Sequence, residues 1–271
     1  MLHREDPAGL VVITQPAHAW VSGQLAQAWG NTHVGYCSPW TEVCLGAEQH
    51  DIGWLAWEAS PTLNPQTGRP HSFLEMPTTL HVAIWSAAAR MALALGRYPA
   101  LLVSLHGTGL YERYGRTYAT AEEERAVQEW LAGEYTLQRE LVASLQADSY
   151  YAPYVTPEMI ARNRQLVAVW DMLSLALCMG IYTPHTFDAV PAANGTIALT
   201  LTPVADNAQH IQVTPWPFRE ETVTLVCEGR RLPQQYDSEE RMRQALLAAP
   251  WVTIRLSLHP AANSGVPVEK R

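Results

Sequence analysis

The chain has 271 residues, 48% of them hydrophobic and 16% charged, and its net charge at pH 7 is −8. A chain of this length can bury a sizeable core, and it contains no apolar run of about 18 residues that could cross a membrane. The acidic balance argues against nucleic-acid polymers and anionic membranes as partners. No basic segment followed by an apolar one opens the sequence, so we expect a cytoplasmic protein without a signal peptide. The four cysteines form no Cys-X-X-Cys motif and are expected to be buried free thiols.

The first part of the chain has the spacing of amphipathic helices. Residues 9–15 are typical of a short strand, which Pro16 ends. Six helices are then predicted, over residues 17–29, 41–58, 75–95, 100–106, 121–147 and 156–179. Gly107-Thr108-Gly109 is expected to interrupt the fourth of them. It does not follow a strand and lacks a third glycine, so we do not interpret it as a phosphate-binding loop.

After residue 190 the pattern changes to the alternation of half-exposed strands. Four strands are predicted, over residues 196–202, 210–213, 222–227 and 251–258, with a helix over 238–248 between the last two. We expect them to form a small antiparallel sheet, which the strand at residues 9–15 can join. The predicted fold is therefore mainly α, with a helical domain over residues 1–190 and a small β-rich region over 191–271.

Asp171 is the most informative candidate site residue. It interrupts the apolar run at residues 167–173, and a lone buried carboxylate costs several kcal/mol unless its charge is compensated. Arg164 lies seven residues earlier on the same helix face, too far for an easy ion pair, and Arg162 lies off that face. A metal ion is therefore favoured over a salt bridge, although both interpretations stay open.

Histidines and a second aspartate occur on the other predicted helices. With Asp171 they form the series His18, His50-Asp51, His81, His106 and Asp171. Each histidine alone is more often a hydrogen-bonded core residue than a ligand. Together, however, their order resembles the HD-domain superfamily, an all-helical fold whose metal site consists of a His, a His-Asp pair and a distant Asp. The two additional histidines resemble those of the dinuclear HD enzymes.

This resemblance implies an HD-like helical bundle that holds two divalent metal ions. His18, His50, Asp51 and Asp171 would hold the first ion, and Asp51, His81 and His106 the second. Asp51 would then bridge the two ions and be the central catalytic residue. Iron or manganese is expected, with magnesium, nickel or zinc as alternatives. Glu48 is a candidate acceptor for a hydrogen bond from a ligand imidazole, although a glutamate there is more commonly solvated.

Two segments, at residues 15–26 and 48–54, also resemble a bacterial group catalogued as domain of unknown function 3891. The first reads Gln-Pro-Ala-His-Ala-Trp-Val-Ser-Gly-Gln-Leu-Ala, and the second contains Glu-Gln-His-Asp-Ile-Gly-Trp. That group has no established activity. The resemblance therefore implies a site rather than a reaction.

Our leading functional hypothesis is a metal-dependent phosphohydrolase of the HD type. It would act on a small phosphorylated or nucleotide-like substrate through a metal-bridged hydroxide. One alternative is an HD-type mixed-valence di-iron oxygenase, and another is a non-catalytic metal-binding or ligand-sensing protein. The expected partner is a small anionic substrate, and a homodimer is left open.

Trp54 marks a departure from the dinuclear HD pattern. Many such proteins carry a lysine three residues after the aspartate of the pair, and tryptophan cannot replace it as a proton donor, so the general acid is unassigned. Trp54 is instead a candidate for the mouth of a substrate pocket. Arg113, Arg116 and Arg164 are candidate ligands for an anionic substrate, although an exposed arginine-tyrosine loop explains the first two slightly better.

Overall fold

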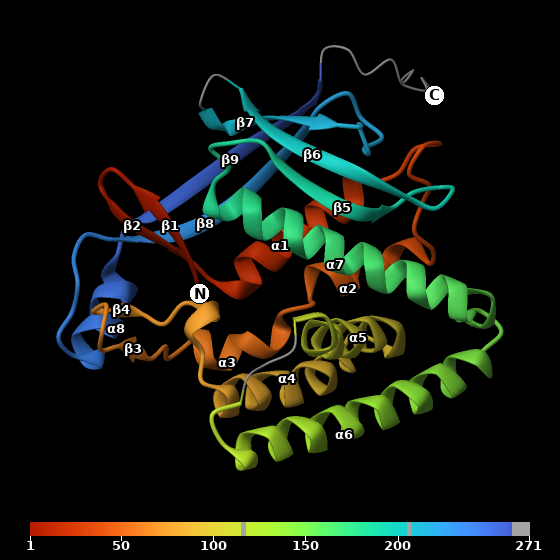
Figure 1. Cartoon of the computed structure of the whole chain (residues 1–271), viewed down its shortest axis with the longest axis horizontal. Coiled ribbons are helices and arrows are strands. Elements are labelled where there is room, and N and C mark those ends of the chain that lie inside the picture. The colour runs from red at the N-terminus through yellow and green to blue at the C-terminus, as the bar shows by residue number, and fades with distance from the viewer. Residues whose placement is uncertain (115–117, 205–206, 262–271) are drawn as a thin grey trace.

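The computed structural model describes residues 1–114, 118–204 and 207–261. It contains a seven-stranded sheet above a stack of helices (Figure 1). Helices α1 (Gln15–Ala28) and α7 (Pro157–Met179) lie directly beneath the sheet. Below them lie α2, α4 and α5, and the long helix α6 forms the outer edge (Figure 1).

The remaining helices follow the chain in order. They are α2 (Trp40–Glu48), η1 (Ile52–Trp54), α3 (Leu55–Glu58), η2 (Phe73–Glu75), α4 (Thr78–Ala92), α5 (Arg97–Tyr114), α6 (Ala121–Gln146), η3 (Ala152–Tyr154) and α8 (Glu239–Ala248). The predictions for α6, α7 and α8 are confirmed to within a residue or two. Their first turns are capped by hydroxyl side chains, which accept hydrogen bonds from backbone N–H groups inside the helix.

The sheet has the strand order β1-β2-β8-β9-β7-β6-β5, and all its pairs are antiparallel except the parallel pair β7–β9. Its strands are β1 (Leu2–Asp6), β2 (Gly9–Ile13), β5 (His185–Pro191), β6 (Thr196–Val204), β7 (Asn207–Thr214), β8 (Val223–Leu232) and β9 (Trp251–Pro260). The short strands β3 (Leu63–Asn64) and β4 (Arg69–Pro70) form a separate hairpin. The sheet takes strands from both sides of residue 190, the predicted domain boundary.

The prediction of a mainly α, all-helical fold with a small appended sheet is wrong, because the chain is an α+β protein with a large sheet. Strand β1 was not predicted from the sequence, because Arg4 occupies an inward position where an apolar residue is expected. The Arg4 guanidinium is buried because it donates to the carbonyl oxygens of Leu177 and Cys178 at the end of α7. Strand β5 was not predicted either, because a register shift between Phe187 and Val190 breaks the alternation of buried and exposed residues.

The prediction that His50 and Asp51 lie on a helix is also wrong. Helix α2 ends at Glu48, and the pair lies in a turn before η1. Gly53 explains the bend, because it packs directly on α4. A Cβ atom there would lie 2.5 Å from the Ile84 carbonyl oxygen and 2.8 Å from the Ala88 side chain.

Helix α5 continues through Gly107-Thr108-Gly109, where we expected an interruption. These glycines serve close packing rather than a break. A Cβ on Gly107 would lie 2.7 Å from the Trp85 ring, and one on Gly109 would lie 3.0 Å from the Arg164 guanidinium. The close approach brings α5 against α4 and α7, which places the side chains of His106 and Asp171 on facing helices.

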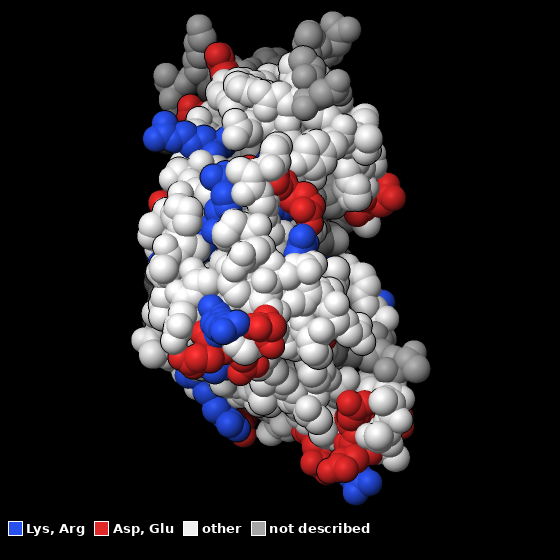
Figure 2. Space-filling model, turned by 90° about the vertical axis from the view of Figure 1, so that its left-hand side faces the viewer, with Lys and Arg blue, Asp and Glu red and all other residues white. Residues whose placement is uncertain are grey.

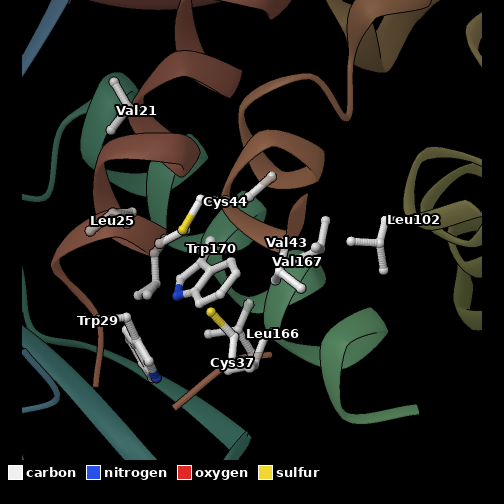
Figure 3. Close-up of a cluster of buried hydrophobic side chains, with 14 of the residues drawn as sticks. Val21, Leu25, Trp29, Cys37, Val43, Cys44, Leu102, Leu166, Val167 and Trp170 are labelled. Carbon is white, nitrogen blue, oxygen red and sulfur yellow. The ribbon is translucent and has the colours of Figure 1, made fainter. Parts of the chain in front are cut away.

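The main core extends from the sheet into the stack of helices, and one part of it fills the space between α1, α2 and α7 (Figure 3). Trp170 lies at its centre with no exposed surface, next to Val43, Cys44 and Leu166 (Figure 3). Burial of each such side chain contributes roughly 1.5–3 kcal/mol. All four cysteines are buried and free, as expected. Since Trp170 anchors α7 in this core, the next residue, Asp171, is held at a fixed position beside it.

The surface carries no dominant charge on the face shown in Figure 2. Basic and acidic side chains lie next to one another there, with acidic side chains gathered at the lower end. None of the helices in the described ranges is long and apolar enough to span a bilayer.

Candidate metal centre

Four parts of the chain bring five of the predicted ligands together. Helix α1 contributes His18, the turn after α2 contributes His50 and Asp51, α5 contributes His106, and α7 contributes Asp171. All five side chains are buried. His18 stands in the first turn of α1, which Pro16 and the side-chain cap of Thr14 fix in place.

The five side chains form two overlapping groups that could each hold a metal ion. His18, His50 and Asp51 make the first group, and His50, His106 and Asp171 make the second. Within each group the ligand atoms lie within 4.8 Å of one another. His50 belongs to both groups, so the site is a single continuous cluster of imidazoles and carboxylates.

One ring nitrogen of His50 is directed at the two carboxylates of the cluster. Its Nδ1 donates to the carbonyl oxygen of Ala47 at 2.8 Å, which in the neutral imidazole leaves a lone pair on Nε2. That Nε2 atom is buried and has no hydrogen-bond partner in the described part of the chain. It lies 3.5 Å from Asp51 Oδ2 and 3.4 Å from Asp171 Oδ1. A buried polar atom without a partner is unfavourable, and coordination of a cation would satisfy it.

His18 shows the same requirement for a cation. Its Nε2 atom lies 2.7 Å from Asp51 Oδ2, so either a proton lies between these two atoms or both of them bind the same cation. Its Nδ1 atom lies 2.8 Å from the Ser174 hydroxyl, which in turn donates to the Asp171 carbonyl oxygen at 2.8 Å. A His18 that donates its Nδ1–H to Ser174 directs the Nε2 lone pair at the cluster, as a metal ligand must.

The two carboxylates of the cluster pair with histidines. Among the described residues, all the ion pairs of Asp51 and Asp171 are with histidines, and none is with a lysine or an arginine. Burial alone would raise the pKa of both carboxyl groups, but their interactions with the neighbouring imidazoles outweigh burial and lower it. Both are therefore ionised at neutral pH, and the site contains two buried negative charges.

The imidazoles respond to these charges in opposite ways. Burial lowers the pKa of His50, yet electrostatic attraction to the carboxylates of Asp51 and Asp171 raises it well above its ordinary value. Burial and the nearby His50 lower the pKa of His106 to about 4. The cluster thus stabilises positive charge at His50, between the two carboxylates, and keeps His106 neutral at neutral pH.

His106 and Asp171 also line a cavity of about 550 Å³ between α5 and α7. Arg113 and Arg164 lie in its wall, as does Glu112, which is paired with Arg164. The cavity therefore connects the buried cluster to two of the arginines predicted to bind substrate. Arg116, the third, lies outside the described residues.

His81, the remaining predicted ligand, lies outside both groups. It is buried on α4, where its Nδ1 atom lies 2.6 Å from the Tyr111 hydroxyl and its Nε2 atom accepts from the Trp85 indole at 3.1 Å. The predicted second ligand set of Asp51, His81 and His106 is not brought together among the described residues. The structure places His50, His106 and Asp171 together instead.

Two further predicted residues take positions away from the cavity. Trp54 is only 1% exposed and packs against Trp57 and His81, and it does not contribute to the described cavity wall. Glu48 is half-buried at the end of α2, against Gly23 of α1. The Nδ1–H of His50 has the Ala47 carbonyl oxygen as its acceptor, rather than Glu48.

Sequence reasoning assigned no role in the site to two serines. Ser174 accepts from the Nδ1–H of His18, and Ser22 lies 2.8 Å from Ser174. Their spacing contained a usable signal, because Ser22 is four residues after His18 and Ser174 is three after Asp171. Residues three or four apart share a helix face.

The fold and the site define an α+β protein with a buried histidine-aspartate centre that could hold a metal ion. A model of the family described as "Protein of unknown function (DUF3891)" matches residues 1–234, and the chain belongs to this family. The matched region contains every residue of the cluster. No curated protein and no solved structure matched the chain.

Proposed function

We propose that this protein is a metal-dependent hydrolase that acts on a small phosphorylated substrate in the cavity between α5 and α7. The observation that carries the proposal is the cluster of three histidines and two aspartates, which is buried, lacks a lysine or arginine among its described partners and borders that cavity. A pocket that combines convergent polar groups with shifted pKa values is a strong candidate for an active site.

The residues fit a divalent cation. His18, His50 and Asp51 would hold one ion, and His50, His106 and Asp171 provide the donors for a second position. Mixed imidazole and carboxylate donors suit iron, manganese or zinc. A bound divalent ion would supply Lewis-acid chemistry, lowering the pKa of a water molecule and polarising a phosphoryl oxygen.

The protein's own groups would orient the substrate. His106 and Asp171 are the cluster residues that face the cavity, so a substrate reaches the centre on their side. Leu105, Leu110 and Ile160 line the same cavity with apolar surface. Asp51 lies deeper, between His18 and His50, and its predicted bridging role is part of this proposal.

An HD-type centre is the finer form of the proposal. It is supported by the order of the donors along the chain and by their location on separate helices and a turn. Trp54, in the position where many dinuclear HD proteins have a lysine, is buried in a secondary core cluster with Trp57 and Ile84. The proton for the leaving group must therefore come from another residue or from water.

Metal analysis combined with turnover tests the proposal. Protein purified without chelator is expected to contain at least one divalent ion per chain and to hydrolyse members of a panel of small phosphate esters. Asp171→Asn should lose the metal and the turnover. Asp237→Asn, which removes an exposed carboxylate paired with Arg241, should keep both.

The other outcomes are distinguishable. Two irons with substrate-dependent oxygen consumption, and no ester hydrolysis, would replace the hydrolase with a di-iron oxygenase. Bound metal without ester hydrolysis and without substrate-dependent oxygen consumption would indicate a non-catalytic metal-binding protein. Unchanged metal content in Asp171→Asn would contradict the proposed centre itself.

A further inference from the structure

The cavity wall contains two arginines whose partners differ. Arg164 forms an ion pair with Glu112, and Glu112 also accepts from the Tyr135 hydroxyl at 2.9 Å. The charge of Arg164 is therefore already neutralised, and its guanidinium is held in the wall between α5 and α7.

Arg113 has no carboxylate partner among the described residues. Its Nη1 atom lies 3.7 Å from the sulfur of Met172, and its guanidinium lies 6.0 Å from the centre of the Tyr114 ring. A thioether is a weak acceptor, so most of the five N–H donors of this arginine have no acceptor among the described residues. Within the described part of the chain, Arg113 thus offers a positive charge and available donors at the cavity wall.

The location of this guanidinium is specific. The Arg113 side chain extends from α5 to Met172, which directly follows the candidate ligand Asp171 on α7. Both Arg113 and Met172 line the cavity. An anion bound by Arg113 would therefore lie in the space that His106 and Asp171 border.

We propose that Arg113 binds the oxyanion of the substrate, while Arg164 is a structural residue of the wall. This inference rests on the proposed function and deepens it. A guanidinium binds phosphate or carboxylate through two parallel N–H donors. Leu110, Ile160 and Met172 line the same space with apolar surface, so the substrate carries a non-polar organic group beside its anionic one. The substrate class is a small organic phosphate with an apolar body.

Phenyl phosphate is a suitable probe, because it combines a phosphate with a small apolar ring. Its dissociation constant can be measured by calorimetry on the metal-containing protein, with phenol and benzoate as the uncharged and carboxylate comparisons. We expect the wild-type protein to bind phenyl phosphate more tightly than phenol. Tighter binding of benzoate than of phenyl phosphate would overturn the assignment of a phosphate and favour a carboxylate.

Two matched variants separate the arginines. Arg113→Met keeps a long apolar side chain and should weaken phenyl phosphate binding by about tenfold or more. Arg164→Met should weaken it by less than about threefold, since that arginine already has a carboxylate partner. Circular dichroism and metal content check that both variants are folded and loaded.

A double variant gives an independent test. Glu112→Gln leaves Arg164 without its carboxylate partner, so the Arg164 guanidinium becomes available to bind phosphate. The double variant Arg113→Met/Glu112→Gln should therefore recover part of the phenyl phosphate affinity that Arg113→Met loses. Unchanged affinity in Arg113→Met, equal losses in the two arginine variants, or no binding of phenyl phosphate by the wild-type protein would each overturn the inference.

The inference and the proposed function can fail separately. If phenyl phosphate binds through Arg113 and is not hydrolysed, and no ester of the panel is hydrolysed, the binding assignment stands and the hydrolase proposal fails. If esters are hydrolysed with the same KM by the wild-type protein and by Arg113→Met, the hydrolase stands and the role of Arg113 is wrong.

Discussion

The buried His81 differs from the buried histidines of the cluster in what its ring nitrogens contact. The indole of Trp85 contacts both His81 and the cluster residue His106, with ring centroids 6.0 Å and 5.6 Å apart. Both nitrogens of His81 are engaged by protein groups, Tyr111 and Trp85. His50 uses one nitrogen for the protein and directs the other at two carboxylates.

This difference shows which buried histidines are candidate metal ligands. Burial does not separate the two kinds, because His81 is 7% exposed and His106 is 5% exposed. The pattern of hydrogen bonds does separate them. A ligand needs one unprotonated nitrogen directed at the ion, and the other nitrogen is commonly fixed by a hydrogen bond.

Replacement of His50 and of His81 should break this comparison most clearly. His50→Ala removes a donor shared by both groups, so we expect metal affinity to fall by about 100-fold or more, beyond the loss usual for an outer hydrogen-bond partner. His81→Ala should keep the metal and instead lower the free energy of unfolding by about 2 kcal/mol, through a lost hydrogen-bond pair and a cavity. Metal titration and chemical denaturation measure the two effects.

Loss of metal in His81→Ala as well as in His50→Ala would contradict our grouping of the ligands. It would favour the ligand set first predicted from the family resemblance, in which His50 holds the first ion and His81 the second. His33→Ala is the matched control, because His33 is exposed and its side chain makes no hydrogen bond within the described residues.

The serine that orients His18 should have a smaller effect. Ser174→Ala removes the acceptor for the Nδ1–H of His18, and loss of such a partner typically weakens metal binding about 10–100-fold. Ser104→Ala is the control, since Ser104 is equally buried but donates to Glu134 at 2.5 Å, away from the cluster. Equal metal affinity in the two serine variants would show that Ser174 does not orient the ligand.

Much of the centre could be predicted because its residues break apolar helical patterns. Asp171 within residues 167–173 and His106 at the end of an apolar run were informative, since burial of such groups requires compensation. The grouping could not be predicted in full. Whether His81 joins the cluster depends on the separation of α4 from α1 and α7, and helix periodicity contains no information on that distance.

The sheet was underestimated for a related reason. Alternation in sequence predicts a strand only when inward positions are apolar, and Arg4 in β1 is buried through hydrogen bonds to the end of α7 instead. Order along the chain also hides pairing, because β2 pairs with β8 across more than two hundred residues. Such long-range pairing is fixed by packing, and the local pattern does not reveal it.

Glu134 provides a final, smaller test, because it is a buried carboxylate without a surrounding cluster of histidines. Burial raises its pKa above the ordinary value, whereas the imidazoles lower the pKa of Asp171. A carboxyl group whose pKa is higher in the folded than in the unfolded state binds its proton more tightly when folded. The protein therefore loses the corresponding stability as the pH rises above the unfolded value of about 4.3.

Glu134→Gln removes this pH dependence of stability. Its melting temperature should therefore rise relative to wild type between about pH 4 and pH 7, on the order of 1–2 °C. Glu129→Gln, on the exposed face of α6, controls for the loss of one negative charge. The same relative rise in both variants would show that net charge, rather than the burial of Glu134, is responsible.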